Sequence, residues 1–208
     1  PGGSSTQRPV RPAPSNATIE KVAAQKEVVD AGQEDVSARW LALEERVRIC
    51  TRCALHTGRT QTVFGEGNRQ AQIVFVGEGP GFDEDRAGRP FVGKAGQLLD
   101  KIIGAAGWRR EEVFICNVVK CRPPENRTPL PDEAGTCLPF LEEQLALVRP
   151  RVIIALGKTA VQGLFGTAEG ITRIRGRWRL YQGRVAVMPT FHPAYLLRTL
   201  PDKAKAWA

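Results

Sequence analysis

Four cysteines fall into two pairs whose spacing suits metal chemistry. Cys50 and Cys53 are separated by two residues at the end of a predicted helix, so both sulfurs can face one point. Cys121 and Cys137 bracket a proline-rich loop and the helix after it. Four thiolates on two separated segments can bind a tetrahedral zinc ion or an iron–sulfur cluster, and the spacing does not choose between them. The alternative is unpaired core cysteines, the interpretation that we give to Cys116 inside an apolar strand.

A second group of candidate residues follows the ends of predicted strands. Glu78 and Gly79 belong to the glycine-rich loop GEGPG, directly after the apolar run 72–76. Asn117 lies near the end of a second apolar run, and His192 follows another. Because the carboxyl ends of parallel strands share one edge of a sheet, these side chains can line one crevice. Each residue alone is more simply a strand-end hydrogen bond or core packing, and their joint placement favours a binding site.

The residue types in this crevice suit a planar ligand with an amide-like edge. Asn117 offers both a hydrogen-bond donor and an acceptor. A neutral His192 can donate to an oxygen that becomes negatively charged. Phe91, from the loop after the first strand, could supply a face for stacking.

These residues require an α/β domain to position them. Four apolar runs, which are rich in β-branched residues and separated by helical patterns, predict buried strands at 72–76, 113–119, 151–156 and 184–188. The predicted fold is a three-layer α/β/α sandwich around a four-stranded parallel sheet. Alternation over residues 170–183 predicts an antiparallel hairpin. Pro139 lies within a predicted helix at 132–148 and is expected to kink or shorten it.

Composition adds a domain boundary and a class of partner. Residues 1–36 are rich in Pro, Ser, Gly and Ala, which predicts a disordered tail before a folded domain at 37–208. The net charge of +8 is consistent with a nucleic-acid partner, and ordinary surface arginine usage explains it equally well. No apolar run approaches the ~20 residues of a membrane span, so we expect no membrane association. Five cysteines without a secretion signal favour a reducing cytosol over a disulfide scaffold.

Several motifs resemble those of the family 4 uracil-DNA glycosylases, the iron–sulfur branch of the uracil-DNA glycosylase superfamily. They are GEGPG followed by EDRAGRPFVGKAGQLLD, then NVVKCRPPENRTP, the four-cysteine pattern, and FHPAYLLR. The resemblance covers nearly everything from Cys50 to Trp207 and leaves out residues 1–36.

The resemblance implies a DNA-repair hydrolase that flips uracil out of DNA and cleaves its N-glycosidic bond, leaving an abasic site. It implies that Asn117 reads the Watson–Crick edge of uracil, that Phe91 stacks on its ring, and that His192 contacts O2 and favours the departing anion. It further implies a [4Fe–4S] cluster on Cys50, Cys53, Cys121 and Cys137.

Other matching positions are assigned by resemblance alone. Glu78 and Glu84 are the candidate catalytic acids, and Gly79 and Asn126 are candidates for substrate binding. The segment that would wedge into the duplex as the base is flipped is Tyr195, Leu196, Leu197 and Arg198.

Two departures from related families sharpen these expectations. Family 1 enzymes have a water-activating Asp and a thymine-excluding Tyr at the positions of Gly79 and Gly81, so the choice of general base stays open here. A cross-linking relative, which attaches itself to DNA through the matching histidine, has Gln at the position of Gly79 and a basic insertion before the histidine. This chain has neither feature, so we expect turnover with His192 non-covalent.

Two other functions compete with this one. A non-catalytic or cross-linking nucleic-acid-binding relative would keep the fold and the cluster. A dinucleotide site is a weak third, because GEGPG does not match the spacing G-x-G-x-x-G. The favoured interpretation is a monomer that acts on single- or double-stranded uracil-containing DNA in the bacterial or archaeal cytosol, associated with the nucleoid.

Overall fold

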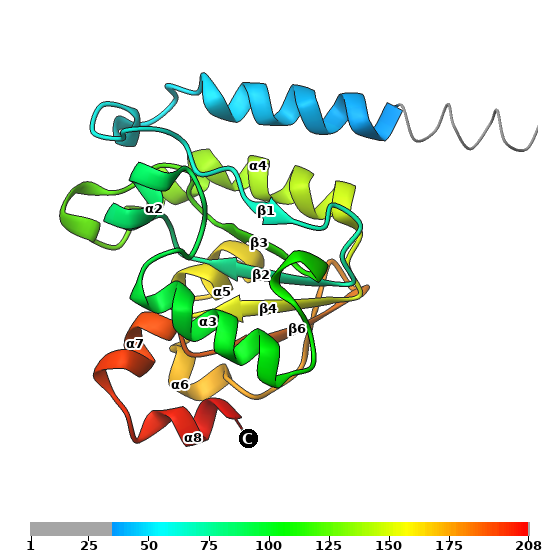
Figure 1. The fold of residues 1–208 in the computed structure, drawn as a ribbon, viewed down its shortest axis with the longest axis vertical. Helices are drawn as coiled ribbons and strands as arrows, with labels where there is room; N and C mark the ends of the chain where they lie inside the picture. The colour runs from blue at the N-terminus through cyan, green and yellow to red at the C-terminus, as the bar shows by residue number, and fades with distance from the viewer. Residues whose placement is uncertain (1–34, 208) are drawn as a thin grey trace, which may run out of the picture. The chain divides into compact units, whose positions relative to one another are not determined.

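The computed structural model describes residues 35–207 (Figure 1). Residues Trp40–Ala208 form one compact unit. The predicted tail lies outside the described residues except for its last two, which belong to a helical stretch at 35–48. Within the described residues, no helix is long and apolar enough to cross a membrane.

A mixed sheet of six strands forms the centre of the compact unit. The strands are β1 (Glu66–Gly67), β2 (Ile73–Gly77), β3 (Phe114–Asn117), β4 (Val152–Leu156), β5 (Arg179–Tyr181) and β6 (Val185–Thr190). Their order is β1-β3-β2-β4-β6-β5. The four inner strands are parallel, as predicted, and the two edge strands pair antiparallel to their neighbours. The α/β sandwich is therefore confirmed, with an edge strand added on each side.

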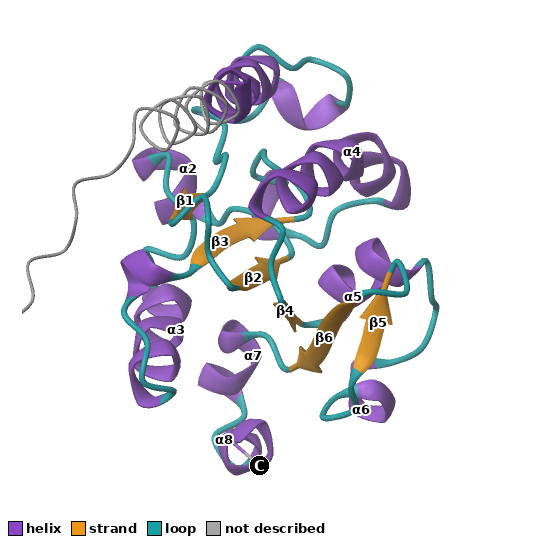
Figure 2. Ribbon diagram, turned by 90° about the vertical axis from the view of Figure 1, so that its right-hand side faces the viewer, coloured by secondary structure: helices purple, strands orange, loops and turns teal. Residues whose placement is uncertain are grey.

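Helices cover both faces of this sheet. They are α2 (Phe82–Ala87), α3 (Lys94–Ala105), α4 (Pro131–Val148), α5 (Lys158–Phe165), α6 (Ile171–Ile174), α7 (Pro193–Arg198) and α8 (Asp202–Trp207), with short 3-10 turns η1 (Ala54–His56), η2 (Arg110–Glu112) and η3 (Pro124–Asn126). Figure 2 shows α4 and α5 on one face and α3 and α7 on the other. Right-handed crossovers between parallel strands place helices in this way.

The sheet is buried because its inner strands are continuous apolar runs. Every residue of β3 is buried, as are the last four of β2. On the α3 face, Leu99 and Ile103 pack into a cluster with Phe75 and Phe91. Phe91 thus belongs to the core although it lies in a loop.

Strand register brings the predicted site residues to one edge. Gly77 pairs with Asn117 across β2 and β3, and Leu156 pairs with Thr190 across β4 and β6. Glu78 follows β2 directly, and His192 lies two residues after the end of β6. The carboxyl edge of the sheet is therefore the surface on which a ligand site can be built.

One local prediction was wrong, and a second was wrong in part. Residues 171–174 form helix α6 instead of the first strand of a hairpin, because Ile171 and Ile174 are one helical turn apart and Ile174 is buried. The second half of the predicted hairpin, β5, does pair with β6. Pro139 does not shorten α4, which runs through it for 18 residues.

Candidate functional site

A cavity of about 470 Å³ lies at the carboxyl edge of the sheet. It is lined by loops that follow β2, β3, β4 and β6. Nine of the residues singled out from the sequence line it: Glu78, Gly79, Glu84, Phe91, Asn117, Asn126, His192, Tyr195 and Arg198. Lys158 and Arg127, which sequence reasoning missed, line it too.

Asn117 presents an unsatisfied amide to this cavity. Its side chain is 1% exposed, and its Oδ1 has no hydrogen-bond partner. A buried polar atom without a partner costs about 1–3 kcal/mol, so such an atom at a cavity wall is suited to a ligand donor. Gly77 is required beside it, because a Cβ there would stand 2.3 Å from Asn117 Oδ1 and 2.6 Å from the Phe91 ring.

Phe91 is fixed in a left-handed backbone conformation. Its φ is +51°, which costs free energy for a side chain of this size. Its ring packs against the His192 ring, with centroids 5.5 Å apart and planes 30° apart. Gly96 is needed behind it, since a Cβ at that position would stand 1.8 Å from the Phe91 carbonyl oxygen.

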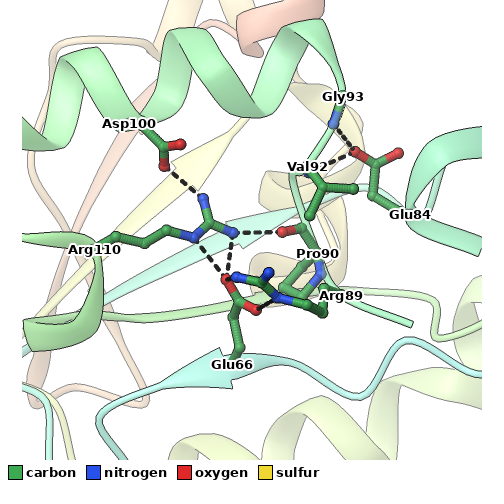
Figure 3. A network of polar contacts seen from close by, with 8 residues as sticks. All are labelled: Glu66, Glu84, Arg89, Pro90, Val92, Gly93, Asp100 and Arg110. Carbon is green, nitrogen blue, oxygen red and sulfur yellow. Dashed lines mark hydrogen bonds and ion pairs between the residues drawn. The ribbon is translucent and has the colours of Figure 1, made fainter. Parts of the chain in front are cut away.

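Charged side chains hold the backbone on both sides of Phe91 (Figure 3). On one side, Arg110 donates to the carbonyl oxygen of Pro90 at 2.5 Å. On the other, Glu84 Oε1 accepts from the N–H groups of Val92 and Gly93, each at 2.9 Å. These bonds offset the strain at Phe91 and fix the direction of its ring.

Arg110 is itself held by two carboxylates (Figure 3). It donates to Glu66 and to Asp100, each at 2.6 Å. Glu66 also accepts from Arg89 at 2.7 Å. Burial opposes ionisation of Glu66, but the two arginines outweigh it and lower the pKa of that carboxyl.

His192 is neutral in this setting, with its proton on Nε2. The pKa of His192 is lowered to about 4, chiefly by burial and also by the charge of Arg198, against the opposing effect of Glu84. Nδ1 accepts a hydrogen bond from the backbone N–H of Ala194 at 3.1 Å. A neutral imidazole that accepts at Nδ1 carries its proton on Nε2, so it is a donor there.

The two candidate acids differ in how their oxygens are used. Glu84 accepts from three backbone N–H groups, those of Gly81, Val92 and Gly93. Glu78 accepts from the Thr159 hydroxyl through Oε2 alone. Glu78 therefore keeps an oxygen available to a ligand or a water, whereas Glu84 is occupied in holding the loop.

The loop between β3 and α4 contributes Asn126 through strained backbone. Asn126 has a φ of +55°, and its Oδ1 accepts from Arg122 Nε at 2.7 Å. Nearby, Arg127 donates to both oxygens of the buried Glu133 at 2.7 and 2.8 Å. Arg127 follows the predicted site residue Asn126 in sequence, but only the structure identifies Glu133 as its partner.

Helix α7 contributes Ala194, Tyr195 and Arg198 to the lining of the cavity. The Tyr195 hydroxyl donates to Asp202 at 2.5 Å, which ties α7 to α8. Leu196 is 2% exposed and packs inside, whereas Leu197 and Leu200 are exposed by 39% and 62%. Of the predicted wedge, Leu197 and Arg198 are thus the side chains that reach solvent, and Leu200 joins them.

The four cysteines singled out from the sequence line a second, smaller cavity. Cys50, Cys53, Cys121 and Cys137 all border it, and Cys116 does not. Arg59 donates to Cys121 Sγ at 3.1 Å, and the backbone N–H of Lys120 donates to Cys137 Sγ at 3.3 Å. Burial raises the pKa of the Cys137 thiol to about 11, with Lys120 opposing that rise. In residues 35–207, no three Cys, His, Asp or Glu side chains are placed to bind a single metal ion.

Lys120 connects the two cavities and was missed from sequence. Its side chain is 1% exposed, and its Nζ donates to the Asn117 carbonyl at 2.8 Å and to Gln144 at 2.6 Å. Gln144 in turn donates to the Phe64 carbonyl at 2.9 Å. Burial lowers the pKa of Lys120. A lysine at the end of a strand is usually exposed, so its type gave no signal of this arrangement.

Comparison with known proteins gives consistent matches. A family model of the uracil DNA glycosylase superfamily matches residues 64–208. A type-4 uracil-DNA glycosylase of Thermotoga maritima is 54% identical over 164 residues, 78% of this chain and 85% of the relative. A type-4 enzyme of Pyrobaculum aerophilum is 46% identical over 165 residues, 75% and 83% of the two chains. A type-5 uracil-DNA glycosylase of Thermus thermophilus is 34% identical over 117 residues, about half of each.

The neutral state of His192 can be tested by titration. With a folded pKa of about 4 and an ordinary unfolded value near 6.5, His192 contributes stability that is complete above pH 6.5 and is lost as the pH falls towards 4. In a His56→Gln variant, the one remaining histidine NMR signal should stay that of the neutral ring from pH 7.5 down to about pH 5. A midpoint of 6 or above would contradict the assignment.

Arg110 should contribute more to the stability of the fold than the neighbouring Arg109. Arg110→Met removes the charged bond to Pro90 and should lower the free energy of unfolding by about 1.5–3 kcal/mol. Amide exchange at Val92 and Gly93 should speed up in the same variant. Arg109→Met is the matched control, because the Arg109 side chain is 70% exposed and pairs only at the surface, so its loss should cost about 0–1 kcal/mol. Equal effects of the two substitutions would refute the proposed bracing of Phe91.

Proposed function

Because this chain belongs to the uracil-DNA glycosylase superfamily and to its type-4 branch, we propose that it removes uracil from DNA by hydrolysing the N-glycosidic bond. The observation that carries the proposal is the unsatisfied Asn117 Oδ1 at the wall of a cavity. The N3–H of uracil would donate to this oxygen, and O4 would accept from the same amide group. In this orientation the amide pairs with both polar atoms of that edge of uracil. Cytosine presents an acceptor at N3 and a donor at N4, so it would pair only if the amide were turned over.

The cavity provides a binding mode for an extruded base. Enzymes that act on one base take it out of the stack, at a cost of a few kcal/mol for a paired base. The buried Phe91 ring gives the planar pyrimidine an apolar surface. Close in sequence to the lining residue Arg198, exposed Leu197 and Leu200 are suited to fill the gap left in the duplex.

His192 would stabilise the leaving group without protonating it. As the glycosidic bond breaks, the bonding electrons move onto uracil and its O2 becomes negative. The Nε2–H of a neutral imidazole donates to that oxygen, and a buried donor that needs no reorganisation is effective there. The low pKa of His192 keeps the ring a donor at neutral pH without making it an acid.

Glu78 is our candidate for the residue that orients water. Cleavage leaves positive charge on the sugar, which needs a water at C1′ and a nearby anion. The oxygen of Glu78 that Thr159 does not occupy can serve both needs. Glu84 we assign to positioning, since its oxygens accept from three backbone N–H groups.

We propose that the cysteine cavity binds a [4Fe–4S] cluster. The donor set of four cysteines fits, and N–H groups of Arg59 and Lys120 already donate to two of the sulfurs. The similar type-4 glycosylases belong to an iron–sulfur family, which favours the cluster over a zinc ion. When bound, the cluster would supply a structural cross-link between the Cys50–Cys53 segment and α4.

The substrate and setting follow from the same site. We propose that the enzyme works as a monomer. Lys158 and Arg198, which line the cavity and make no ion pair within residues 35–207, suit a DNA backbone, single- or double-stranded. We further propose the cytosol of a bacterium or archaeon, because the similar type-4 glycosylases come from such organisms.

Base excision is tested with oligonucleotides that contain one uracil, followed by alkaline cleavage at abasic sites. The wild type should cut at uracil and leave thymine intact. Asn117→Asp should lower kcat/KM for uracil about 10- to 100-fold and narrow the preference for uracil over cytosine, because a carboxylate accepts from the cytosine amino group. The control is Asn68→Asp, which changes an exposed turn. No product from the wild type would leave a nucleic-acid-binding protein without glycosylase activity.

The cluster is tested by colour and metal content. Protein purified without oxygen should absorb broadly near ~400 nm and contain about four irons per chain. Cys121→Ser should lose most of this absorbance, whereas Cys116→Ser should keep it because Cys116 lies outside the cavity. A colourless protein with one zinc per chain would overturn the assignment.

A further inference from the structure

An exposed aromatic residue stands beside the base cavity with two arginines over its ring. Phe82 is 50% exposed and directly follows Gly81, which lines the cavity. The guanidinium of Arg86, one turn along α2, lies 5.6 Å from the ring centroid. That of Arg122, from the loop after β3, lies 5.0 Å from it. These contacts fix two cations from separate segments at one place.

Neither cation is neutralised by a carboxylate. Among the described residues, Arg86 and Arg122 make no ion pair, whereas Arg89, Arg110 and Arg127 all do. The three acids of α2 are directed elsewhere. Glu84 accepts from backbone N–H groups, and Asp85 accepts from the backbone N–H of Thr60. Asp83 lies against Gly93, where its Oδ2 would be 2.6 Å from an added Cβ. Two positioned guanidinium groups without a counter-charge are suited to bind an anion.

This pair of cations is joined to the base cavity by a direct contact. Arg122 Nε donates to Asn126 Oδ1 at 2.7 Å, and Asn126 lines the cavity. Pro123, next to Arg122, lines it as well. An anion bound here would therefore lie at the cavity mouth, and its binding would bear on the position of Asn126.

We propose that Phe82, Arg86 and Arg122 form a clamp for one phosphate of the DNA strand next to the uracil nucleotide. This inference rests on the proposed glycosylase function. A nucleotide whose base enters the cavity leaves its phosphodiester groups at the mouth, where a guanidinium fork can bind phosphate oxygens in pairs. The guanidinium groups over the Phe82 ring favour a phosphate over a stacked base, which would have to displace them.

The clamp can be tested with DNA in which single phosphates are made neutral. The probe is an oligonucleotide that contains 2′-fluoro-2′-deoxyuridine, whose electron-withdrawing fluorine slows bond cleavage. In a matched series, one phosphate at a time within two nucleotides of the uridine is replaced by a methylphosphonate. Dissociation constants are measured for the wild type, for the double variant Arg86→Gln/Arg122→Gln, and for Phe82→Leu.

The clamp predicts a loss at one backbone position that depends on the arginines. The wild type should bind about tenfold more weakly when that one phosphate is neutral. The double variant should bind unmodified DNA about tenfold more weakly and lose nothing further at the same position. Its slope of log Kd against log salt on duplex DNA should fall by about 0.9, the value for one phosphate contact. Phe82→Leu should weaken binding about two- to fivefold.

Arg109→Gln is the control for loss of a surface arginine, because it removes one positive charge from the segment before β3, at the opposite end of that strand from Asn117. It should leave the methylphosphonate pattern unchanged. The clamp would be refuted if the loss of affinity from the double substitution and the loss from the neutral phosphate simply added. It would also be refuted if the slope of log Kd against log salt were the same in the double variant and in Arg109→Gln. The clamp would also be refuted if Phe82→Leu weakened binding equally to unmodified DNA and to DNA with that phosphate neutral. That result would indicate that Phe82 stacks on a base.

The two proposals can fail separately. If the wild type excises uracil but no single phosphate depends on the two arginines, only the clamp is refuted. If one phosphate does depend on the arginines but uracil is not excised, the glycosylase function is refuted and a DNA-binding clamp remains.

Discussion

Charged side chains bind the backbone on both sides of Phe91, and the shape of the base cavity follows from those bonds. Arg110 holds the carbonyl of Pro90, and Glu84 holds the next two N–H groups beyond the ring. The ring is thereby directed into the core cluster and against His192, in a backbone conformation that a free loop would not keep. Glycines at 77 and 96 leave the space that this conformation requires.

The same use of charge recurs at Lys120. This buried cation bonds the carbonyl of Asn117 and the side chain of Gln144 on α4, while its own N–H donates to Cys137. A buried ammonium is costly unless its donors are satisfied, and here they fix the end of β3 to the helix that carries Cys137. Asn117 and the cysteine cavity therefore belong to one polar framework, which agrees with the structural role that we propose for a cluster.

The charges at the site divide into those that hold the protein and those left for a ligand. Arg110 and Arg127 are engaged with Glu66 and Glu133, which are largely buried. Glu78 keeps a free oxygen, and His192 keeps a free Nε2–H because burial holds it neutral. Glu78 and Glu84 therefore differ in what their oxygens bind, although both are acids in one short motif.

The sequence by itself determined the parallel strands, the edge at which they end, and the set of side chains at that edge. Apolar β-branched runs and short motifs carry this information locally, so residues such as Asn117, His192 and the four cysteines could be predicted. The first half of the hairpin at 170–183 was wrong because four residues of alternating pattern also fit one helical turn. Only the tertiary structure decided which partners the charged groups have: Thr159 with Glu78, Gln144 with Lys120, Arg110 with Pro90 and Arg122 with Phe82. Those partners are separated by 20 to 81 residues, and a contact over that distance depends on how the whole chain closes, which no local pattern records.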